Sequence, residues 1–124
     1  MSFNNSHYLQ KLYIAYFGRP ADPSGLNYWL LRLNKTHSLK DISYELSIQD
    51  EYVKYNSHEK SFELKINKVY MNLFNRKADF DGLNYWLELV DTKKYKISDI
   101  VYDLIYQRVN LLSINSEQEK LDLL

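Results

Sequence analysis

Residues 13–30 read YIAYFGRPADPSGLNYWL, and residues 70–87 repeat them as YMNLFNRKADFDGLNYWL. The two stretches are offset by 57 residues, from Tyr13 to Tyr70, and 11 of the 18 aligned positions are identical. Self-similarity of this length is typical of a chain built from two copies of one supersecondary unit. This repeat decides the predicted fold.

The likeness extends beyond the opening motif. Residues 99–104 (DIVYDL) match residues 41–46 (DISYEL) after one inserted residue. We therefore expect a single domain over residues 1–124, with repeat one at about 6–55, repeat two at about 62–113, and a short C-terminal helical tail at 116–124.

Each repeat predicts three helices. The first helix carries apolar residues at i, i+3, i+4, i+7 and i+8, which form one stripe on a helical surface. These residues are Leu9, Leu12, Tyr13, Tyr16 and Phe17, echoed by Ile66, Val69, Tyr70, Leu73 and Phe74. A second helix contains the tryptophan, and a third runs from Leu39 to Val53 in repeat one. The predicted fold is all-α: a six-helix bundle of two tandem three-helix repeats with a pseudo-two-fold relation.

Composition excludes several classes of protein. The 124 residues include 16 basic and 16 acidic side chains and no cysteine. A neutral chain argues against nucleic-acid binding, and the lack of cysteine excludes disulfide frameworks and thiolate chemistry. No apolar run reaches the roughly 20 residues of a membrane span, and no signal peptide is visible at the start of the chain. We expect no cofactor.

The repeated segment Arg-x-Ala-Asp-x-x-Gly-Leu-Asn-Tyr-Trp is interpreted as architectural. Its Asp precedes a helix, where a carboxylate can accept from free N–H groups, and its Gly allows close approach. Its Arg would pair with an acid or cover helix carbonyls, and its Trp would anchor the core. The predicted structural motif comprises Arg19, Asp22, Gly25, Tyr28, Trp29, Arg76, Asp79, Gly82, Tyr85 and Trp86.

A calcium loop is a weak alternative for the second motif. Asp79, Asp81 and Glu88 match three ligand places of a helix–loop–helix calcium site. Lys77, however, stands where the first carboxylate should be, and the apolar stripe predicts a helix where the loop should curl around the ion. We favour the structural interpretation.

Catalytic patterns are absent from the sequence. His7, His37 and His58 lie far apart and in no metal-binding spacing, so surface or capping roles are expected. The chain has no Gly-rich phosphate loop and no nucleophile elbow. We therefore predict that the protein is not an enzyme.

Twelve tyrosines are the unusual feature of the composition. Tyr13, Tyr16, Tyr28, Tyr70 and Tyr85 belong to the repeated helices and are expected in the core or at its rim. The others could form a surface for protein contacts or sugar stacking, or could equally fill the helix rim. The candidate interface residues are Tyr44, Tyr52, Tyr55, Tyr95, Tyr102, Tyr106, Leu121 and Leu124.

The motif at residues 19–29 and 76–86 resembles a bacterial domain-of-unknown-function family with the segment Arg-Pro-Ala-Asp-Pro-x-Gly-Leu-x-Tyr-Trp. The first repeat fits closely, whereas the second departs at Lys77 and Phe80. Such domains occur in secreted, surface-layer and adhesin-type proteins, so the resemblance implies an extracellular, non-catalytic module. A more distant similarity is to phycobilisome linker domains, which assemble other proteins.

The leading functional hypothesis is a structural module for protein–protein assembly or self-association on a cell surface. Binding of glycans through exposed tyrosines is one alternative. A small intracellular, linker-like or virion assembly protein is another, which would place the chain in the cytoplasm or in a particle.

Overall fold

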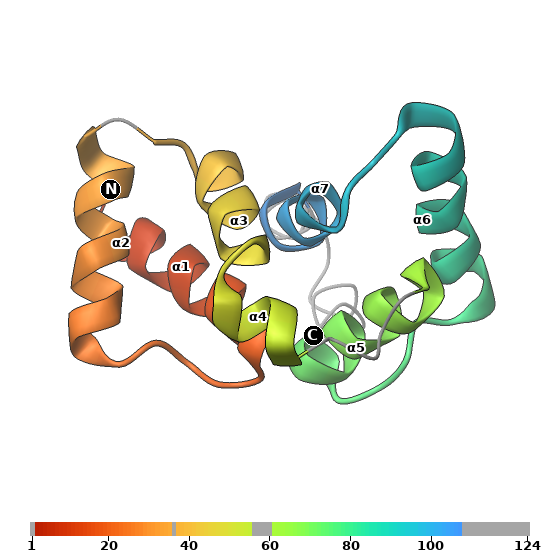
Figure 1. Ribbon diagram of the computed structural model, residues 1–124, viewed down its shortest axis with the longest axis horizontal. Helices are drawn as coiled ribbons and strands as arrows, with labels where there is room; N and C mark the ends of the chain where they lie inside the picture. The colour runs from red at the N-terminus through yellow and green to blue at the C-terminus, as the bar shows by residue number, and fades with distance from the viewer. Residues whose placement is uncertain (1, 36, 56–60, 108–124) are drawn as a thin grey trace, which may run out of the picture.

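The protein is described by a computed structural model that covers residues 2–35, 37–55 and 61–107. It is helical, with no strand in these ranges, so the predicted all-α class is confirmed. The helices are α1 (Ser2–Phe17), α2 (Pro23–Lys35), α3 (Leu39–Ser47), α4 (Asp50–Tyr55), α5 (Phe62–Phe74), α6 (Phe80–Lys93) and α7 (Ile97–Tyr102), and a π-helical turn, η1 (Asp103–Gln107), continues α7 (Figure 1).

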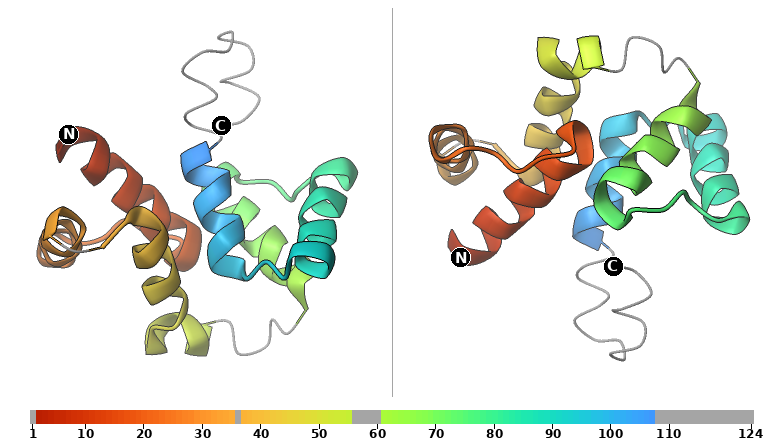
Figure 2. Two further views of the ribbon diagram at one scale, coloured as in Figure 1. Left: turned by 90° about the horizontal axis from the view of Figure 1, so that it is seen from above. Right: turned by 90° about the horizontal axis from the view of Figure 1, so that it is seen from below.

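The helices are arranged with α3 and α7 in the middle of the molecule and with α2 and α6 at its two ends (Figures 1 and 2). The first half of the chain (residues 2–55) meets the second half (residues 61–107) mainly where α3 packs against α7 and α1 against α5. The two outer helices are therefore attached to the rest of the molecule along one side only.

One buried cluster draws side chains from both halves. Most of the apolar stripes predicted for α1 and α5 lie inside it, while Tyr13, Leu73 and Phe74 are partly buried and pack against it. Its most deeply buried members are Leu9, Leu12, Tyr16, Ile42 and Leu46 from the first half, and Ile66, Val69, Ile100, Val101 and Leu104 from the second. Burial of apolar surface across this boundary is the main force that holds the halves together.

Buried polar groups also join the halves. The Tyr16 hydroxyl donates to the Ser43 carbonyl oxygen at 2.9 Å, and the Ser43 hydroxyl donates to the Ser98 carbonyl oxygen at 2.9 Å. Asn72 donates from its side-chain amide to the Ala15 carbonyl oxygen at 2.9 Å. Burial raises the pKa of the Tyr16 phenol well above its ordinary value, so this hydroxyl stays neutral. Each bond satisfies a group that would otherwise be costly to bury.

Helix ends in the two halves use related chemistry. Gly18 follows α1 with φ 73°, and Asn75 follows α5 with φ 58°, so both helices end in the left-handed region. Glycine and asparagine are the residues that adopt this conformation most readily. At the start of α3, Ser38 and Asp41 form a reciprocal capping box, as their spacing predicts.

The third helix of the first half differs from its prediction. In the first half it does not run to Val53: α3 ends at Ser47, and Val53 is an exposed residue of a separate helix, α4. Near the end of α3, the Ser47 hydroxyl donates to the Tyr44 carbonyl, and the Gln49 side chain donates to the Glu45 carbonyl. These side chains take up carbonyls that a continuing helix would use. The prediction of one third helix per repeat is therefore wrong for the first half.

Several sequence predictions lie outside the described residues. These include the helical tail at 116–124 with Leu121 and Leu124, the end of the second repeat beyond residue 107, and the side chain of Tyr55. Within the described ranges, none of the helices combines the length and the apolar character needed to cross a membrane.

Candidate functional site

The two aspartates of the motif cap the outer helices. Asp22 accepts from the Gly25 backbone N–H at 2.7 Å, and Asp79 accepts from the Gly82 N–H at 2.7 Å. The hydrogen bond from Gly25, helped by the Ser24 hydroxyl, holds the pKa of Asp22 below its usual range. Both carboxylates are thus used for helix initiation, in agreement with their position in the sequence.

The two glycines leave room for these caps. A Cβ atom on Gly82 would lie 3.0 Å from the Asp79 Oδ1 and 3.6 Å from the Tyr70 hydroxyl oxygen. A Cβ on Gly25 would lie 3.2 Å from the Asp22 Oδ1. The close approach expected at both positions is therefore present, and the contact with the capping aspartate is the tighter one in the second half.

A tyrosine on one helix satisfies the tryptophan of the next. The Trp86 indole donates from Nε1 to the Tyr70 hydroxyl at 3.0 Å, and Trp29 donates to the Tyr13 hydroxyl at 3.3 Å. Both indoles are buried, so each N–H needs such a partner. The core-anchoring role predicted for the tryptophans is confirmed.

The two motif arginines have different contacts. Arg19 forms an ion pair with Glu51 of α4 at 2.5 Å, and its guanidinium lies over the Phe17 ring. Arg76 lies over the Tyr70 ring and donates to the Lys77 carbonyl oxygen at 3.2 Å. The first arginine thus links α4 to the motif, whereas the second covers an aromatic ring.

The weak calcium candidate does not have the backbone it requires. Residues 80–93 form the single helix α6, so Asp81 and Glu88 stand on a helical surface and Asp79 serves as its cap. A calcium loop would wrap these residues around the ion instead. In the described part of the chain, no three histidine, aspartate or glutamate side chains gather as metal ligands would.

The tyrosines require two corrections. Tyr52 was predicted on a contact surface, but only 6% of it is exposed, and its ring packs edge-on against Tyr16. Tyr28 and Tyr85 were predicted in the core or at its rim, but they are 53% and 54% exposed. The neighbouring tryptophan faces the core in each case, and the next position on a helix points about 100° away.

The other candidate interface tyrosines lie in several places. Tyr102 and Tyr106 are half-buried and stack with ring centroids 5.2 Å apart. Tyr95 donates to Asp103 at 2.6 Å, and this hydrogen bond raises the pKa of Tyr95 to about 12. Tyr44 is exposed, with the Lys96 ammonium 5.2 Å from its ring centroid. The structure does not bring these residues together as one surface.

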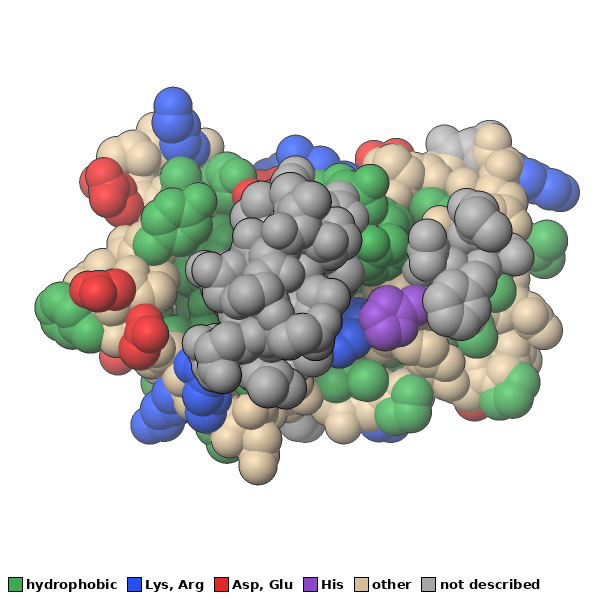
Figure 3. All heavy atoms as spheres, turned by 180° about the vertical axis from the view of Figure 1, so that it is seen from behind, with side chains coloured by type: hydrophobic (Ala, Val, Ile, Leu, Met, Phe, Trp, Pro, Cys, Tyr) green, Lys and Arg blue, Asp and Glu red, His purple; other side chains and the backbone are tan. Residues whose placement is uncertain are grey.

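The outward faces of α2 and α6 are the apolar surfaces that the sequence analysis missed. Leu31 on α2 is 59% exposed and Phe80 at the start of α6 is 80% exposed, in addition to the exposed Tyr28 and Tyr85. In the view from behind, hydrophobic side chains are visible at both ends of the molecule (Figure 3). The sequence contained a signal for their exposure, because these residues lie outside the apolar stripe that each helix buries.

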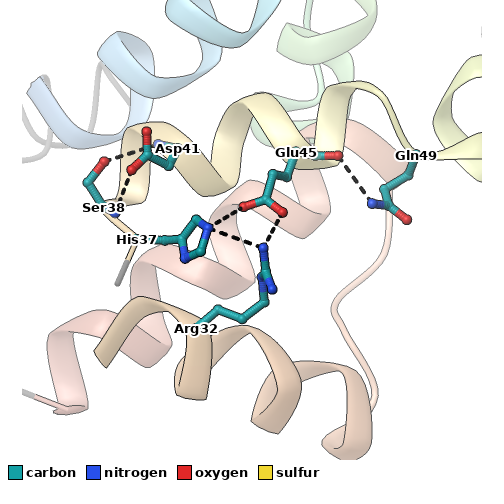
Figure 4. A network of polar contacts seen from close by, with 6 residues as sticks. All are labelled: Arg32, His37, Ser38, Asp41, Glu45 and Gln49. Carbon is teal, nitrogen blue, oxygen red and sulfur yellow. Dashed lines mark hydrogen bonds and ion pairs between the residues drawn. The ribbon is translucent and has the colours of Figure 1, made fainter. Parts of the chain in front are cut away.

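A polar groove of about 550 Å³ lies where α3 and α7 begin. At its edge, Arg32 donates to the Glu45 Oε1 at 2.5 Å, and the His37 Nε2 lies 3.2 Å from the Arg32 Nη2 and 3.5 Å from the Glu45 Oε2 (Figure 4). On the opposite wall, Lys40 lies 3.9 Å from Asp99. The Arg32–Glu45 pair joins α2 to α3, and the Lys40–Asp99 pair joins α3 to α7. We therefore interpret these ion pairs as contacts that stabilise the packing of the helices.

A smaller hollow of about 290 Å³ lies beside the first motif. Its lining combines the aromatic rings of Tyr13, Phe17, Tyr28 and Trp29 with two polar side chains, Gln49 from the segment between α3 and α4 and Glu51 from α4. Aromatic faces together with hydrogen-bonding side chains are suited to sugar rings as well as to peptide side chains.

Comparison with known proteins adds one finding. Residues 2–56 match the family described as "Domain of unknown function (DUF4214)". The matched segment runs from α1 to α4 and contains the first motif, so the match supports the resemblance to a bacterial domain-of-unknown-function family. No curated protein and no solved structure matches the chain.

Proposed function

We propose that the protein is a non-catalytic helical module that acts by protein–protein association. The observation that supports this function is the pair of exposed tyrosines, Tyr28 and Tyr85, at the same position of the repeated motif. Leu31, three residues after Tyr28 on α2, adds to the exposed apolar surface there, and Phe80 is a further exposed ring on α6. Exposed aromatic side chains on an otherwise polar surface are typical of sites where another protein binds.

The chain is best interpreted as two copies of one helical unit with a pseudo-two-fold relation. Equivalent contacts support this proposal, because the aspartate cap and the tyrosine–tryptophan hydrogen bond recur 57 residues apart. On this interpretation α4 is an addition to the first unit. A module of this kind presents two related outer helices to its partners.

The resemblance to domains of secreted and surface-layer proteins favours a place on the cell surface. A cytoplasmic or virion location would instead favour the linker-like assembly role. Immunodetection of the protein in medium, surface fraction, particles and cytosol of its native cells separates these proposals.

Site-specific photo-crosslinking in native cells tests the association itself. A photoreactive amino acid is placed at Leu31 on α2, at Phe80 on α6, and at Lys54 on α4 as the exposed control. We expect defined protein adducts from Leu31 and Phe80 and none from Lys54, read by mass spectrometry. Equal labelling from all three positions, or no adduct from either outer helix, would contradict the proposal.

Carbohydrate binding is a second candidate because of the aromatic hollow beside Tyr28. The exposed Tyr28 ring could stack on a sugar, while Gln49 and Glu51 could bind its hydroxyl groups. A glycan array probed with the wild type and with Tyr28→Ala provides the test. Signals that are lost in Tyr28→Ala but kept in Tyr85→Ala would favour this candidate, and an array without signals would exclude it for the glycans displayed.

A further inference from the structure

The two outer helices expose different chemistry at equivalent positions. Ser24, Leu31 and Asn34 on α2 correspond to Asp81, Glu88 and Asp91 on α6, 57 residues later in each case. All six of these side chains are exposed. The repeat therefore places three carboxylates on the outer face of α6 and none on that of α2.

The charges at the two ends of the molecule are complementary. Helix α2 contains no acidic residue, and its last turn carries the exposed Lys35 beside Arg32, whose charge is already paired with Glu45 of α3. Helix α6 carries its three carboxylates against the single basic residue Lys93. In the view from behind, acidic side chains gather at the end of the molecule formed by α6 (Figure 3).

We propose that the partner of the α2 face is the α6 face of a second molecule of the same chain. This proposal rests on the proposed association function and names its partner. Tyr28 and Leu31 of one molecule would cover the Tyr85 region of the next, with Lys35 close to carboxylates. Contact between two α6 faces is disfavoured, because it would bring six carboxylates together.

The position of the two helices determines the kind of assembly. Because α2 and α6 lie at opposite ends of the molecule (Figure 1), the contact joins two different surfaces and leaves one of each free. Such a head-to-tail contact produces an open string of molecules unless the rotation between them closes a ring. A face of 13 residues is about 20 Å long, so each contact belongs to the small, weak class of interfaces.

Two variants disable one face each. Leu31→Glu gives α2 the side chain that α6 has at the same position, so the helix is expected to tolerate it. Glu88→Lys reverses the central charge of the α6 face. Lys54→Glu changes an exposed charge on α4 and is the control, and circular dichroism verifies that all three variants are folded.

Sedimentation equilibrium from micromolar to millimolar concentration gives the readout. We expect the wild type and the control to exceed twice the monomer mass of 14.9 kDa, and to return to it at about 1 M salt. Each face variant alone should remain monomeric, and an equimolar mixture of the two should associate again. Head-to-tail assembly is overturned if the wild type remains monomeric or stops at a dimer. It is also overturned if the equimolar mixture of the two face variants does not associate.

The two proposals can fail separately. If the purified wild type is monomeric but the Leu31 crosslinker captures a different protein in native cells, the second-molecule partner is excluded and the association function stands. If neither self-association nor an adduct is found, both proposals are wrong.

Discussion

Gly82 is the residue where the packing of the motif leaves the least space. Its missing Cβ would lie 3.0 Å from the Asp79 carboxylate that caps α6. We expect Gly82→Val to lower the free energy of unfolding by about 1–3 kcal/mol, because the Asp79 carboxylate that caps α6 must shift. The better helix propensity of valine opposes this loss by only about 0.5 kcal/mol. Urea denaturation followed by circular dichroism measures the difference.

Asn84→Val is the matched control for this substitution. It places the same branched side chain on the same helix at an exposed position. If Gly82→Val costs no more than Asn84→Val, close packing at the glycine is not the cause of its presence in both repeats.

The tyrosine–tryptophan hydrogen bond offers a second comparison at the level of single residues. Tyr70→Phe leaves the buried Trp86 N–H without its acceptor, which costs about 1–3 kcal/mol. Tyr13→Phe removes the longer and partly exposed bond to Trp29, so its cost should be smaller. Urea denaturation of the two variants measures both losses of unfolding free energy. A larger loss in Tyr13→Phe than in Tyr70→Phe would show that burial of the hydrogen bond does not determine its contribution.

Tyr95 predicts an alkaline dependence of stability. Its folded-state pKa is about 12, against about 10 in the unfolded chain, because the protonated phenol donates to Asp103. The resulting stabilisation is complete below pH 10 and is lost as the pH rises through 12. In Tyr95→Phe, the decline of unfolding free energy between about pH 10 and 12 should therefore be shallower. Urea denaturation of the wild type and of Tyr95→Phe at each pH measures the two slopes, and equal slopes would contradict the prediction.

At the level of elements, α2 and α4 are each held by an ion pair, and the two pairs differ in how far they are buried. Arg32 and Glu45 are about three-quarters buried, whereas Arg19 and Glu51 are about half-exposed. Glu45→Gln should thus cost about 1–3 kcal/mol, because a buried guanidinium loses its carboxylate. Glu51→Gln should cost less than about 1 kcal/mol, as is usual for exposed pairs. Thermal or urea melts of both variants decide this, and equal costs would mean that burial of the Arg32 network adds nothing.

The elements also show where sequence periodicity is informative and where it stops. The stripes of α1 and α5 were predictable because each buried residue falls at helical spacing. The break between α3 and α4 was not, because Val53 keeps a helical spacing from Leu46 while Ser47 and Gln49 take up carbonyls of α3. The sequence pattern also did not predict the π-helical turn η1, in which Leu104 and Ile105 are both buried.

The candidate surface was less predictable than the fold for a related reason. The hydrophobic pattern identifies the side of a helix that is buried. Trp29 and Trp86 lie on that side, so the neighbouring Tyr28 and Tyr85 point away from it and are exposed. Tyr52 was misplaced because its helix packs on α1 through a contact between separate elements. Which tyrosines remain exposed depends on how the helices assemble, and composition does not carry that information.

For the molecule as a whole, the shared core predicts that both halves unfold in one step. The buried cluster spans the halves, and the Tyr16, Ser43 and Ser98 hydrogen bonds lie within the boundary between them. The two tryptophans allow a direct test, since Trp29 lies in the first half and Trp86 in the second.

Trp29→Phe leaves fluorescence that reports only on the second half, and Trp86→Phe leaves a signal only from the first. In each variant we expect the fluorescence transition in urea to coincide with the loss of helical circular dichroism, as a cooperative two-state transition requires. Comparison within one variant removes the effect of the substitution on stability itself. If the halves instead unfolded independently, fluorescence would precede the loss of helix in one variant and follow it in the other, because the less stable half would melt first.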